Sequence, residues 1–273
     1  MSIQVRPSAV AGSWYPGNAQ ELSVLINDFL SGIEDTSNKG DTWGLIVPHA
    51  GYFYSGRTAA HGFAKLRGST QKKVAILAPM HRWAHGFYFA PRCTHYETPL
   101  GQVAVDTEAL ETLARHIPIT MLDGDEEHAL EIQLPFLQHI LGDFVLLPLM
   151  IGHSDIQLLE VLVEALAGLD DYRQGLWIAS SDLNHESDYE TVVRKDAKII
   201  SALKENHLPA LESVLMKDSC TACGRLSIIT LLRLAHQWGH SDLEICDHLN
   251  SGDVTGEKTP GQYTVGYVSA VIK

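Results

Sequence analysis

Three short runs of apolar residues, each of a length typical of a buried strand, stand out along the chain. They cover residues 44–47, 73–78 and 176–179. A polar segment with a histidine follows each run, and these histidines are His49, His81 and His185. Strands without alternating polar positions are typical of parallel sheets that are covered on both faces. Because such sheets bind ligands just outside the carboxyl ends of their strands, we expect the three histidines at that edge.

Amphipathic helical patterns separate these runs, with apolar side chains recurring every three or four residues. The predicted helices cover residues 22–30, 57–66, 107–115, 126–140, 156–169, 189–205, 208–216 and 226–234. Further strands are predicted at residues 103–105, 144–150, 243–246 and 263–271, and a loop with a turn at residues 96–101. Strands that alternate with helices indicate an α/β fold, with a central, mainly parallel or mixed sheet flanked by helices.

Length and composition favour a single domain over residues 1–273. No stretch rich in Pro, Gly or Ser divides the 273 residues, and a hydrophobic content of 45% is enough for a sizeable core. Trp14 and Tyr15, ahead of the first helix, are expected to cover that core, with a place beside the site as the alternative for Trp14. Residues 1–6 lack the apolar part of a signal peptide, and no later stretch could span a bilayer. The cytoplasm is therefore the expected compartment.

The net charge limits the classes of partner. It is −13 at pH 7 without a cluster of Lys or Arg, whereas nucleic acids and anionic membranes require a basic face. We therefore expect no nucleic acid and no membrane as partners. The chain has 4 cysteines, Cys93, Cys220, Cys223 and Cys246. In a chain of this length they do not form a secreted disulfide framework, so free thiols in a reducing compartment are expected.

The pair Cys220 and Cys223 has three interpretations. A redox pair of thioredoxin type would follow an early strand, whereas this pair lies far towards the C-terminus. A structural zinc site would need a second ligand pair at short spacing, and the sequence shows none. We favour the interpretation that Cys223 alone matters, because backbone N–H groups near a helix N-terminus would lower its pKa. The resulting thiolate could hold a metal or react, and Cys220 would be a bystander.

His49, His81 and Cys223 together would form a mixed nitrogen and sulfur metal site. Neutral imidazole is the commonest protein ligand for transition metals, and thiolate is a softer ligand. The distance between these residues in the sequence does not count against the site, because parallel strands bring their carboxyl ends together. A single histidine after a strand is weak support, since the chain has 14 histidines and most are expected on solvated or half-buried faces.

Two further pairs of residues carry groups that can move protons. Asp182 and His185 are three positions apart, and they are either two functional groups or a helix N-cap and a surface histidine. Glu127 and His128 could provide proton transfer or a hydrogen bond that supports a ligand histidine from behind, and the alternative is a charged helix face. On a helix, Glu131 would share the face of Glu127 and His128.

Seven segments, taken in this order, resemble the Memo family, which is grouped with AMMECR-type and radical-SAM partners as AmmeMemoRadiSam system protein B. They are AGSWYPG near the start, VPHAGYFYSG at 47–56, LAPMH at 77–81, YETPLG at 96–101, EEHALEIQLPF ending at 136, SSDLNH at 180–185 and ACGR at 222–225. The segments extend across nearly the whole chain with compatible spacing. Together they are far more specific than any one motif.

The resemblance implies a single-domain fold similar to the LigB-type subunit of class III extradiol dioxygenases. In those dioxygenases two histidines and a glutamate hold Fe(II) and leave positions open for substrate and O2. Carried over by motif, His49 and His81 match the metal histidines of the Memo family and Cys223 matches its metal cysteine. His185 would lie beside the site. The motif segments place three more residues around the pocket, Asp182, Glu127 and His128.

A thiolate in place of the carboxylate ligand departs from the dioxygenase pattern. It suits copper, iron or zinc, yet it changes the redox poise of iron and gives the metal a route to oxidise its own ligand. The Memo family is linked to copper or iron binding and redox chemistry. In animals it is also linked to phosphotyrosine peptides of a receptor kinase, but an acidic chain without an obvious Arg cluster is a poor phosphotyrosine binder.

The leading hypothesis is an oxidoreductase with iron or copper on His49, His81 and Cys223, acting on an unknown small-molecule or peptide substrate. His185, oriented by Asp182, would act as an acid or base or donate a hydrogen bond to bound oxygen. One alternative is a zinc hydrolase in which metal-bound water is the nucleophile and Glu127 or His185 is the base. The other is a non-enzymatic partner of a modification complex, together with AMMECR-type and radical-SAM proteins.

Overall fold

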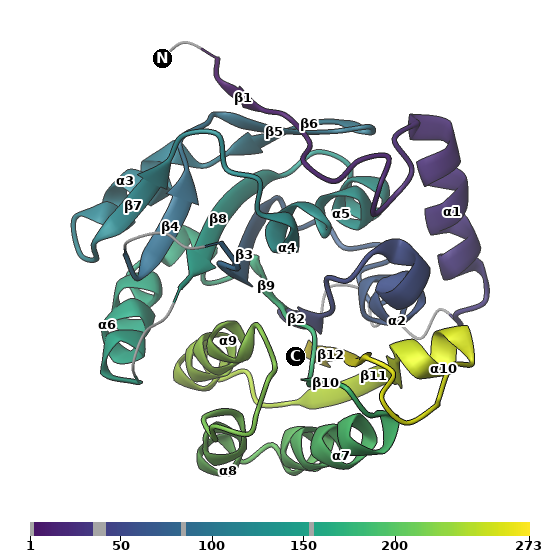
Figure 1. Cartoon of the computed structure of the whole chain (residues 1–273). Helices are drawn as coiled ribbons and strands as arrows, with labels where there is room; N and C mark the ends of the chain where they lie inside the picture. The colour runs from purple at the N-terminus through teal and green to yellow at the C-terminus, as the bar shows by residue number, and fades with distance from the viewer. Residues whose placement is uncertain (1–2, 35–41, 83–85, 153–155) are drawn as a thin grey trace.

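One mixed sheet runs through the centre of the computed structural model, which describes residues 3–34, 42–82, 86–152 and 156–273 (Figure 1). Within those ranges its main path is β1 (Val5–Arg6), β5 (His95–Thr98), β6 (Gly101–Val105), β8 (Val145–Ile151), β3 (Lys73–Pro79), β9 (Leu176–Ser180), β2 (Gly44–Val47), β12 (Thr264–Ile272) and β10 (His185–Glu186). Beside this path, β4 (Tyr88–Pro91) pairs with β8 and with β7 (Ile119–Leu122), and β11 (Leu243–Asn250) pairs with β12. The predicted α/β class with a mixed sheet in a single domain is confirmed.

The four central strands bring their carboxyl ends to one edge of the sheet. β8, β3, β9 and β2 run parallel to one another, and β12 joins β2 in the antiparallel direction. All residues of β2 and β9 are buried, as expected for strands covered on both faces. Val47 pairs in register with Ser180, so β2 and β9 end side by side. The segments that follow β2, β3 and β9 therefore leave the sheet close together.

Helices cover the sheet on both sides. They are α1 (Ala19–Ser31), α2 (Tyr52–Ala64), α3 (Thr107–Ala114), α4 (His128–Glu131), α5 (Leu134–Leu141), α6 (Ile156–Ala167), α7 (Tyr189–Glu205), α8 (Leu208–Leu215), α9 (Arg225–Trp238) and α10 (Ser251–Thr255), with a 3-10 turn at Asp170–Tyr172. α2 packs against β2 and β12 with α1 and α5 beside it, and α9 packs against β3 and β9 with α6 and α8 beside it. Figure 1 shows these two groups on opposite sides of β2 and β9.

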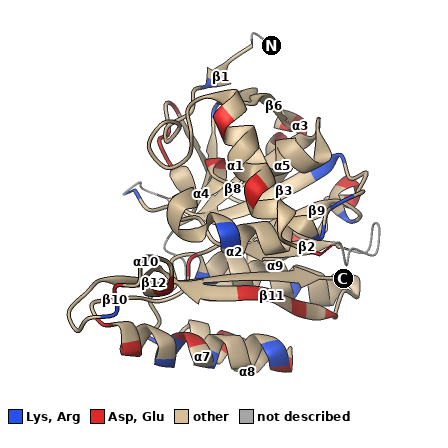
Figure 2. Ribbon diagram, turned by 90° about the vertical axis from the view of Figure 1, so that its right-hand side faces the viewer, with Lys and Arg blue, Asp and Glu red and all other residues tan. Residues whose placement is uncertain are grey.

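The remaining long helix, α7, lies along β11 and β12, and its residue range agrees with the prediction. Figure 2 shows that acidic and basic residues are interspersed along this helix. Its buried face carries apolar residues such as Ile199 and Leu203. None of the helices in the described ranges combines the length and the apolar character needed to cross a bilayer.

The segment at residues 96–101 differs from its prediction as a loop. It contains most of β5 and the turn into β6, and the two strands pair antiparallel with Tyr96 opposite Val103. Tyr96 and Thr98 are buried whereas Glu97 is exposed, which is the alternation of a strand with one covered face. Pro99 hid this pattern because it suggested an irregular segment, but the proline lies in the turn itself.

The helix predicted over residues 126–140 is also wrong as a single element. The structure divides it into α4 and α5, with Ile132 and Gln133 between them. Pro135 stands in the first turn of α5, where its missing N–H costs no hydrogen bond, but it could not lie in the interior of one continuous helix. The break matters for the site, because Glu127 is the N-cap of α4 and Gln133 is the N-cap of α5.

α2 begins at Tyr52, five residues before the predicted start. Gly56 lies inside it, and glycine normally argues against a helix interior. The reason for glycine is the packing of α2 on α1, because a Cβ on Gly56 would lie 2.6 Å from Cε2 of Phe29. α2 therefore packs closely on α1, and its first residues, just after His49, lie at the edge of the sheet where the central strands end.

Candidate metal centre

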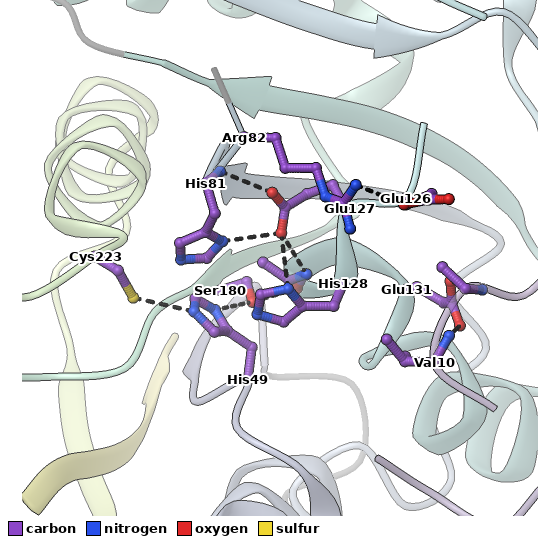
Figure 3. Close-up of polar contacts among 12 residues, drawn as sticks. Val10, His49, His81, Arg82, Glu126, Glu127, His128, Glu131, Ser180 and Cys223 are labelled. Carbon is purple, nitrogen blue, oxygen red and sulfur yellow. Dashed lines mark hydrogen bonds and ion pairs between the residues drawn. The ribbon is translucent and has the colours of Figure 1, made fainter. Parts of the chain in front are cut away.

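His49, His81 and Cys223 come together at the carboxyl edge of the sheet (Figure 3). His49 follows β2, His81 follows β3, and Cys223 lies just before α9. The Sγ atom of Cys223 is 3.0 Å from Nε2 of His49, and one ligand atom from each of the three residues lies within 4.8 Å of the others. Three side chains from distant parts of the sequence thus present donor atoms to one point.

The hydrogen bonds around His49 fix which ring nitrogen is free. Its Nδ1 is 2.9 Å from Oγ of Ser180. That hydroxyl donates to the carbonyl of Ala129 at 2.6 Å and accepts from Nε2 of Gln133 at 2.8 Å. Because its only proton is already used, the hydroxyl oxygen must accept from Nδ1–H of His49. Nε2 then keeps its lone pair, and it faces Cys223.

A carboxylate does the same for His81. Nδ1 of His81 is 2.9 Å from Oε1 of Glu127, and the backbone N–H of His81 donates to Oε2 at 2.7 Å. Burial alone would raise the pKa of Glu127, but the hydrogen bonds from His81 and from the backbone of Ala129 bring it to about 2. The ionised carboxylate accepts the hydrogen bond from Nδ1–H of His81. Nε2 of His81 therefore keeps its lone pair for a metal.

These donors fit a transition metal. Burial lowers the pKa of His49 well below its ordinary value, so the ring is neutral and its Nε2 can donate a lone pair. Two imidazole nitrogens and one sulfur suit iron, copper or zinc. The carboxylate or hydroxyl group on the far side of each ring is the usual support of a metal-ligating histidine. The described residues therefore contain a group that could bind a metal.

The thiol of Cys223 differs from its prediction as a group with a lowered pKa. Burial and the nearby Asp182 raise its pKa, so the thiol is protonated at neutral pH. α9 begins two residues later, and the N–H of Gly224 donates to Oγ of Ser181. A metal would have to displace the thiol proton. Gly224 is required here, because a Cβ would lie 2.3 Å from the carbonyl oxygen of Ser180.

Cys220 lies outside this group. Both Cys220 and Cys223 are free cysteines, and Cys220 is buried in the apolar core. The segment directly after Cys220 is held by Thr221, whose N–H donates to Oδ1 of Asn184 at 2.9 Å. This contact ties the segment that carries Cys223 to the segment that follows β9.

Asp182 supports the loop after β2, and no helix begins at this residue, so the N-cap interpretation is wrong. Its Oδ1 accepts from the backbone N–H groups of His49 at 2.7 Å and Ala50 at 3.3 Å. Burial raises the pKa of Asp182 to about 7, even though these two hydrogen bonds act in the opposite direction. Asp182 therefore positions the backbone of His49 and also lines the pocket above it.

His185 lines the same pocket, although its surroundings differ from the prediction. It lies in β10, opposite Val265, and its Nδ1 is 3.3 Å from the hydroxyl of Tyr263. Among the described residues, that tyrosine and not Asp182 orients the ring. The Nε2 atom of His185 is buried without a hydrogen-bond partner in the described part of the chain. The interpretation of His185 as a surface histidine is wrong.

His128 and Trp14 complete one wall. Nδ1 of His128 is 3.2 Å from Oε1 of Glu127, and its ring stacks on His81 with the centroids 4.8 Å apart. The ring of Trp14 lies over His128 at 4.2 Å and is 36% exposed. Trp14 therefore lines the pocket, and its prediction as a core residue is wrong. Tyr15, in contrast, is buried as predicted.

Glu131 does not share a face with Glu127 and His128. Figure 3 shows it directed away from them, towards Val10. Its carboxylate accepts from Arg6 at 2.6 Å and from the hydroxyl of Tyr15 at 2.7 Å. Further donors to the same carboxylate are Ser8 Oγ and the backbone N–H groups of Ala9 and Val10. The segment that carries Trp14 is thus tied to α4.

Arg6 connects this cluster to the candidate metal centre, and sequence reasoning missed it. Its guanidinium donates to Asp125 at 2.7 Å and to the carbonyl of Glu127 at 2.8 Å. Asp125 in turn accepts from the N–H of Glu127. Both backbone groups of Glu127 are therefore held through Arg6. A lone arginine near the N-terminus carries no local signal for such a role, because its partners lie more than a hundred positions away.

Glu127→Gln should weaken metal binding by about 10- to 100-fold, the usual cost of losing a group that orients a ligand histidine. The amide can still accept a hydrogen bond, but it lacks the charge that holds Nδ1–H of His81. The measurement is competitive metal titration against a chelator. Glu126→Gln is the matched control, because Glu126 pairs with the exposed Arg82 and its loss should leave the affinity unchanged. Equal affinities for all three proteins would contradict this role of Glu127.

The fold and the site together define an α/β protein with a His/His/Cys group at the carboxyl edge of its sheet, where that group could bind a metal. Comparison with known proteins gives the family. A sequence model described as Memo-like protein matches residues 6–271, and the chain belongs to the Memo family.

Its relatives include MEMO1 family proteins of archaea and bacteria. The protein of Thermoplasma acidophilum is 34% identical over 270 residues, covering 97% of this chain and 98% of its own. That of Thermotoga neapolitana is 34% identical over 292 residues, covering 98% and 99%. That of Methanococcoides burtonii is 35% identical over 277 residues, covering 98% and 100%. The similarity therefore extends over whole chains.

Proposed function

We propose that this protein is a metal-dependent oxidoreductase that holds iron or copper on His49, His81 and Cys223. The observation that carries the proposal is that a hydrogen bond holds Nδ1 of His49 and of His81, which leaves both Nε2 atoms with a lone pair, and that Nε2 of His49 faces the sulfur of Cys223. A ring whose tautomer is fixed before the metal arrives loses little free energy on binding it. When bound, iron or copper would supply one-electron chemistry and an open coordination position for a substrate.

The residues around the pocket provide the remaining functions. A cavity of about 710 Å³ is lined by His49 and His81, and it is large enough for a small organic substrate. Burial lowers the pKa of His128 to about 4 and lowers that of His185, so both rings are neutral and can accept a proton. We assign proton transfer to His185, because the buried Nε2 atom has no partner among the described residues and lies in the pocket lining.

Two neighbours of the ligands have positioning roles in this proposal. Glu127 holds the rings of His81 and His128 through one carboxylate oxygen. Asp182 holds the backbone of His49. Neither residue needs to break these hydrogen bonds during a reaction, whereas His185 would transfer a proton.

Redox titration of the metal-loaded protein tests the proposal. Protein loaded anaerobically with one equivalent of iron or copper should take up and release about one electron per metal. The change is followed by absorbance while the potential is varied in steps. Zinc-loaded protein is the control, since zinc has no redox chemistry, and should show no change. An iron or copper site that stays in one oxidation state across the accessible range would overturn the oxidoreductase, and the hydrolase would replace it.

A further inference from the structure

The mouth of the pocket above the candidate metal centre is lined by aromatic rings. Four of its lining side chains are large, aromatic and substantially exposed: Trp14 at 36%, Phe53 at 72%, Tyr54 at 42% and Tyr263 at 60%. They come from three separate segments of the chain, yet they surround one opening. Exposed apolar groups gathered in one place mark a binding surface, whereas single ones carry no such meaning. Tyr267 adds a buried ring deeper in the wall.

The lining of this opening, as far as the structure describes it, contains acidic side chains but no Lys or Arg. Among the described residues that line the pocket, the carboxyl groups of Asp182 and Glu257 are the only side chains of the Asp, Glu, Lys and Arg types. The nearest basic side chain in sequence, Lys258, is paired with Asp253 and lies over the ring of Tyr189. Arg82, beyond His81, pairs with Glu126. Without the metal, an anionic ligand would therefore find no Lys or Arg side chain in the described lining to replace its water.

Aromatic faces and carboxylates attract the same kind of ligand. The face of an aromatic ring carries negative charge density and binds ammonium groups, with the largest effect for Trp. It also stacks on other rings. The Nε2 atom of His185, which has no hydrogen-bond partner among the described residues, lies beside this aromatic wall and can form a hydrogen bond with a polar group of a ligand.

We propose that the pocket binds a small organic cation with a planar apolar part, an arylalkyl ammonium ion, through Trp14 and Tyr263 for the ring and Glu257 for the charge. The inference names the substrate class of the proposed function and rests on it, although the binding preference itself can be measured without the metal. In the metal-free protein it disfavours carboxylates and phosphate esters of similar shape, because no Lys or Arg side chain of the described lining would compensate their desolvation.

A series of three ligands of one shape tests the proposal. Phenethylamine, 2-phenylethanol and 3-phenylpropionate share the ring and differ in charge, which is positive, neutral and negative. Their binding to the full-length protein is measured by calorimetry, with and without one equivalent of metal. In the metal-free protein we expect phenethylamine to bind about fivefold more tightly than 2-phenylethanol, from the known size of cation–π attraction, and 3-phenylpropionate to bind most weakly.

Two variants assign the preference to the named residues. Glu257→Gln should weaken the binding of phenethylamine by about threefold, the size of an exposed charge contact, and leave the binding of 2-phenylethanol unchanged. Trp14→Leu should weaken both ligands, because both use the ring. Glu111→Gln, an exposed carboxylate on α3, is the control for the overall charge of the protein.

The outcomes separate this proposal from the proposed function. In the metal-free protein, equal binding of the three ligands, a preference for the carboxylate, or no binding of any of them would overturn the organic cation as the substrate class. Preference for the amine in a protein that binds no metal would support the pocket assignment and sink the oxidoreductase. A preference for the amine that is undiminished in Glu257→Gln would also contradict the assignment, since the charge recognition would then lie elsewhere.

Discussion

Replacing His49 and Cys223 together by alanine should lower metal affinity by far more than 100-fold while the fold survives. The estimate is a lower bound, because loss of a group that merely orients a ligand already costs about 10- to 100-fold. Two of the three donor atoms would be gone, and the remaining nitrogen of His81 could not hold a metal alone. The measurement is the metal content of the purified variant after incubation with one equivalent of iron or copper, beside its circular dichroism spectrum.

Cys220→Ala is the matched control for this experiment. Cys220 belongs to the same Cys-x-x-Cys segment but lies buried in the apolar core, away from the donor group. Its variant should keep full metal content, as should His116→Ala, which removes an exposed histidine. Loss of metal in Cys220→Ala with retention in the double variant would contradict the assignment and favour a site built on the cysteine pair.

The second large effect is expected on stability, from Arg6→Met. Its guanidinium is 4% exposed and contacts Glu131 at 2.6 Å and Asp125 at 2.7 Å. Removing one partner of a buried ion pair typically costs about 3–5 kcal/mol, because the other charge is left without compensation. Here two carboxylates are left at once. Urea denaturation should show this loss as a lower midpoint with an unchanged slope.

Arg82→Met provides the contrast. Arg82 pairs with Glu126, but the two side chains are 65% and 63% exposed, and such pairs contribute at most about 1 kcal/mol. Its midpoint should therefore be close to that of the wild type. A similar loss in both variants would mean that the buried network around Arg6 does not stabilise the fold more than an ordinary surface pair.

The positions of the candidate ligands could be predicted from the sequence because of one topological regularity. His49 and His81 each follow an apolar run that ends in proline, and parallel strands bring such ends together. Cys223 could be named as a possible third ligand from its residue type, but its place beside them rests on the resemblance to the Memo family, since nothing local marks the segment before α9 as a neighbour of β2. The α/β class followed from the same alternation of strands and helices.

The parts that were missed depend on contacts between distant segments. Periodicity placed Glu131 beside Glu127, but Arg6 and Tyr15 attract its carboxylate to the other side of α4. Trp14 was expected in the core because aromatic residues ahead of a helix usually pack inward. It packs on His128, and nothing in the sequence indicates that these two residues lie opposite each other.

The pKa of Cys223 shows the same limit. Proximity to a helix N-terminus predicted a lowered value, because aligned N–H groups favour a thiolate. Burial of the sulfur and the nearby Asp182 act in the opposite direction and raise the pKa. The balance between these effects depends on how deep the sulfur lies, which the sequence pattern did not contain.

Metal analysis with X-ray absorption on protein purified anaerobically, without added metal, tests the central claim most directly. We predict about one equivalent of iron or copper per chain, with two nitrogen ligands and one sulfur ligand, and loss of the sulfur contribution in Cys223→Ala. Protein without metal, or with a metal surrounded only by oxygen, would contradict a site on His49, His81 and Cys223. Zinc on the same ligands would keep the site and contradict the oxidoreductase.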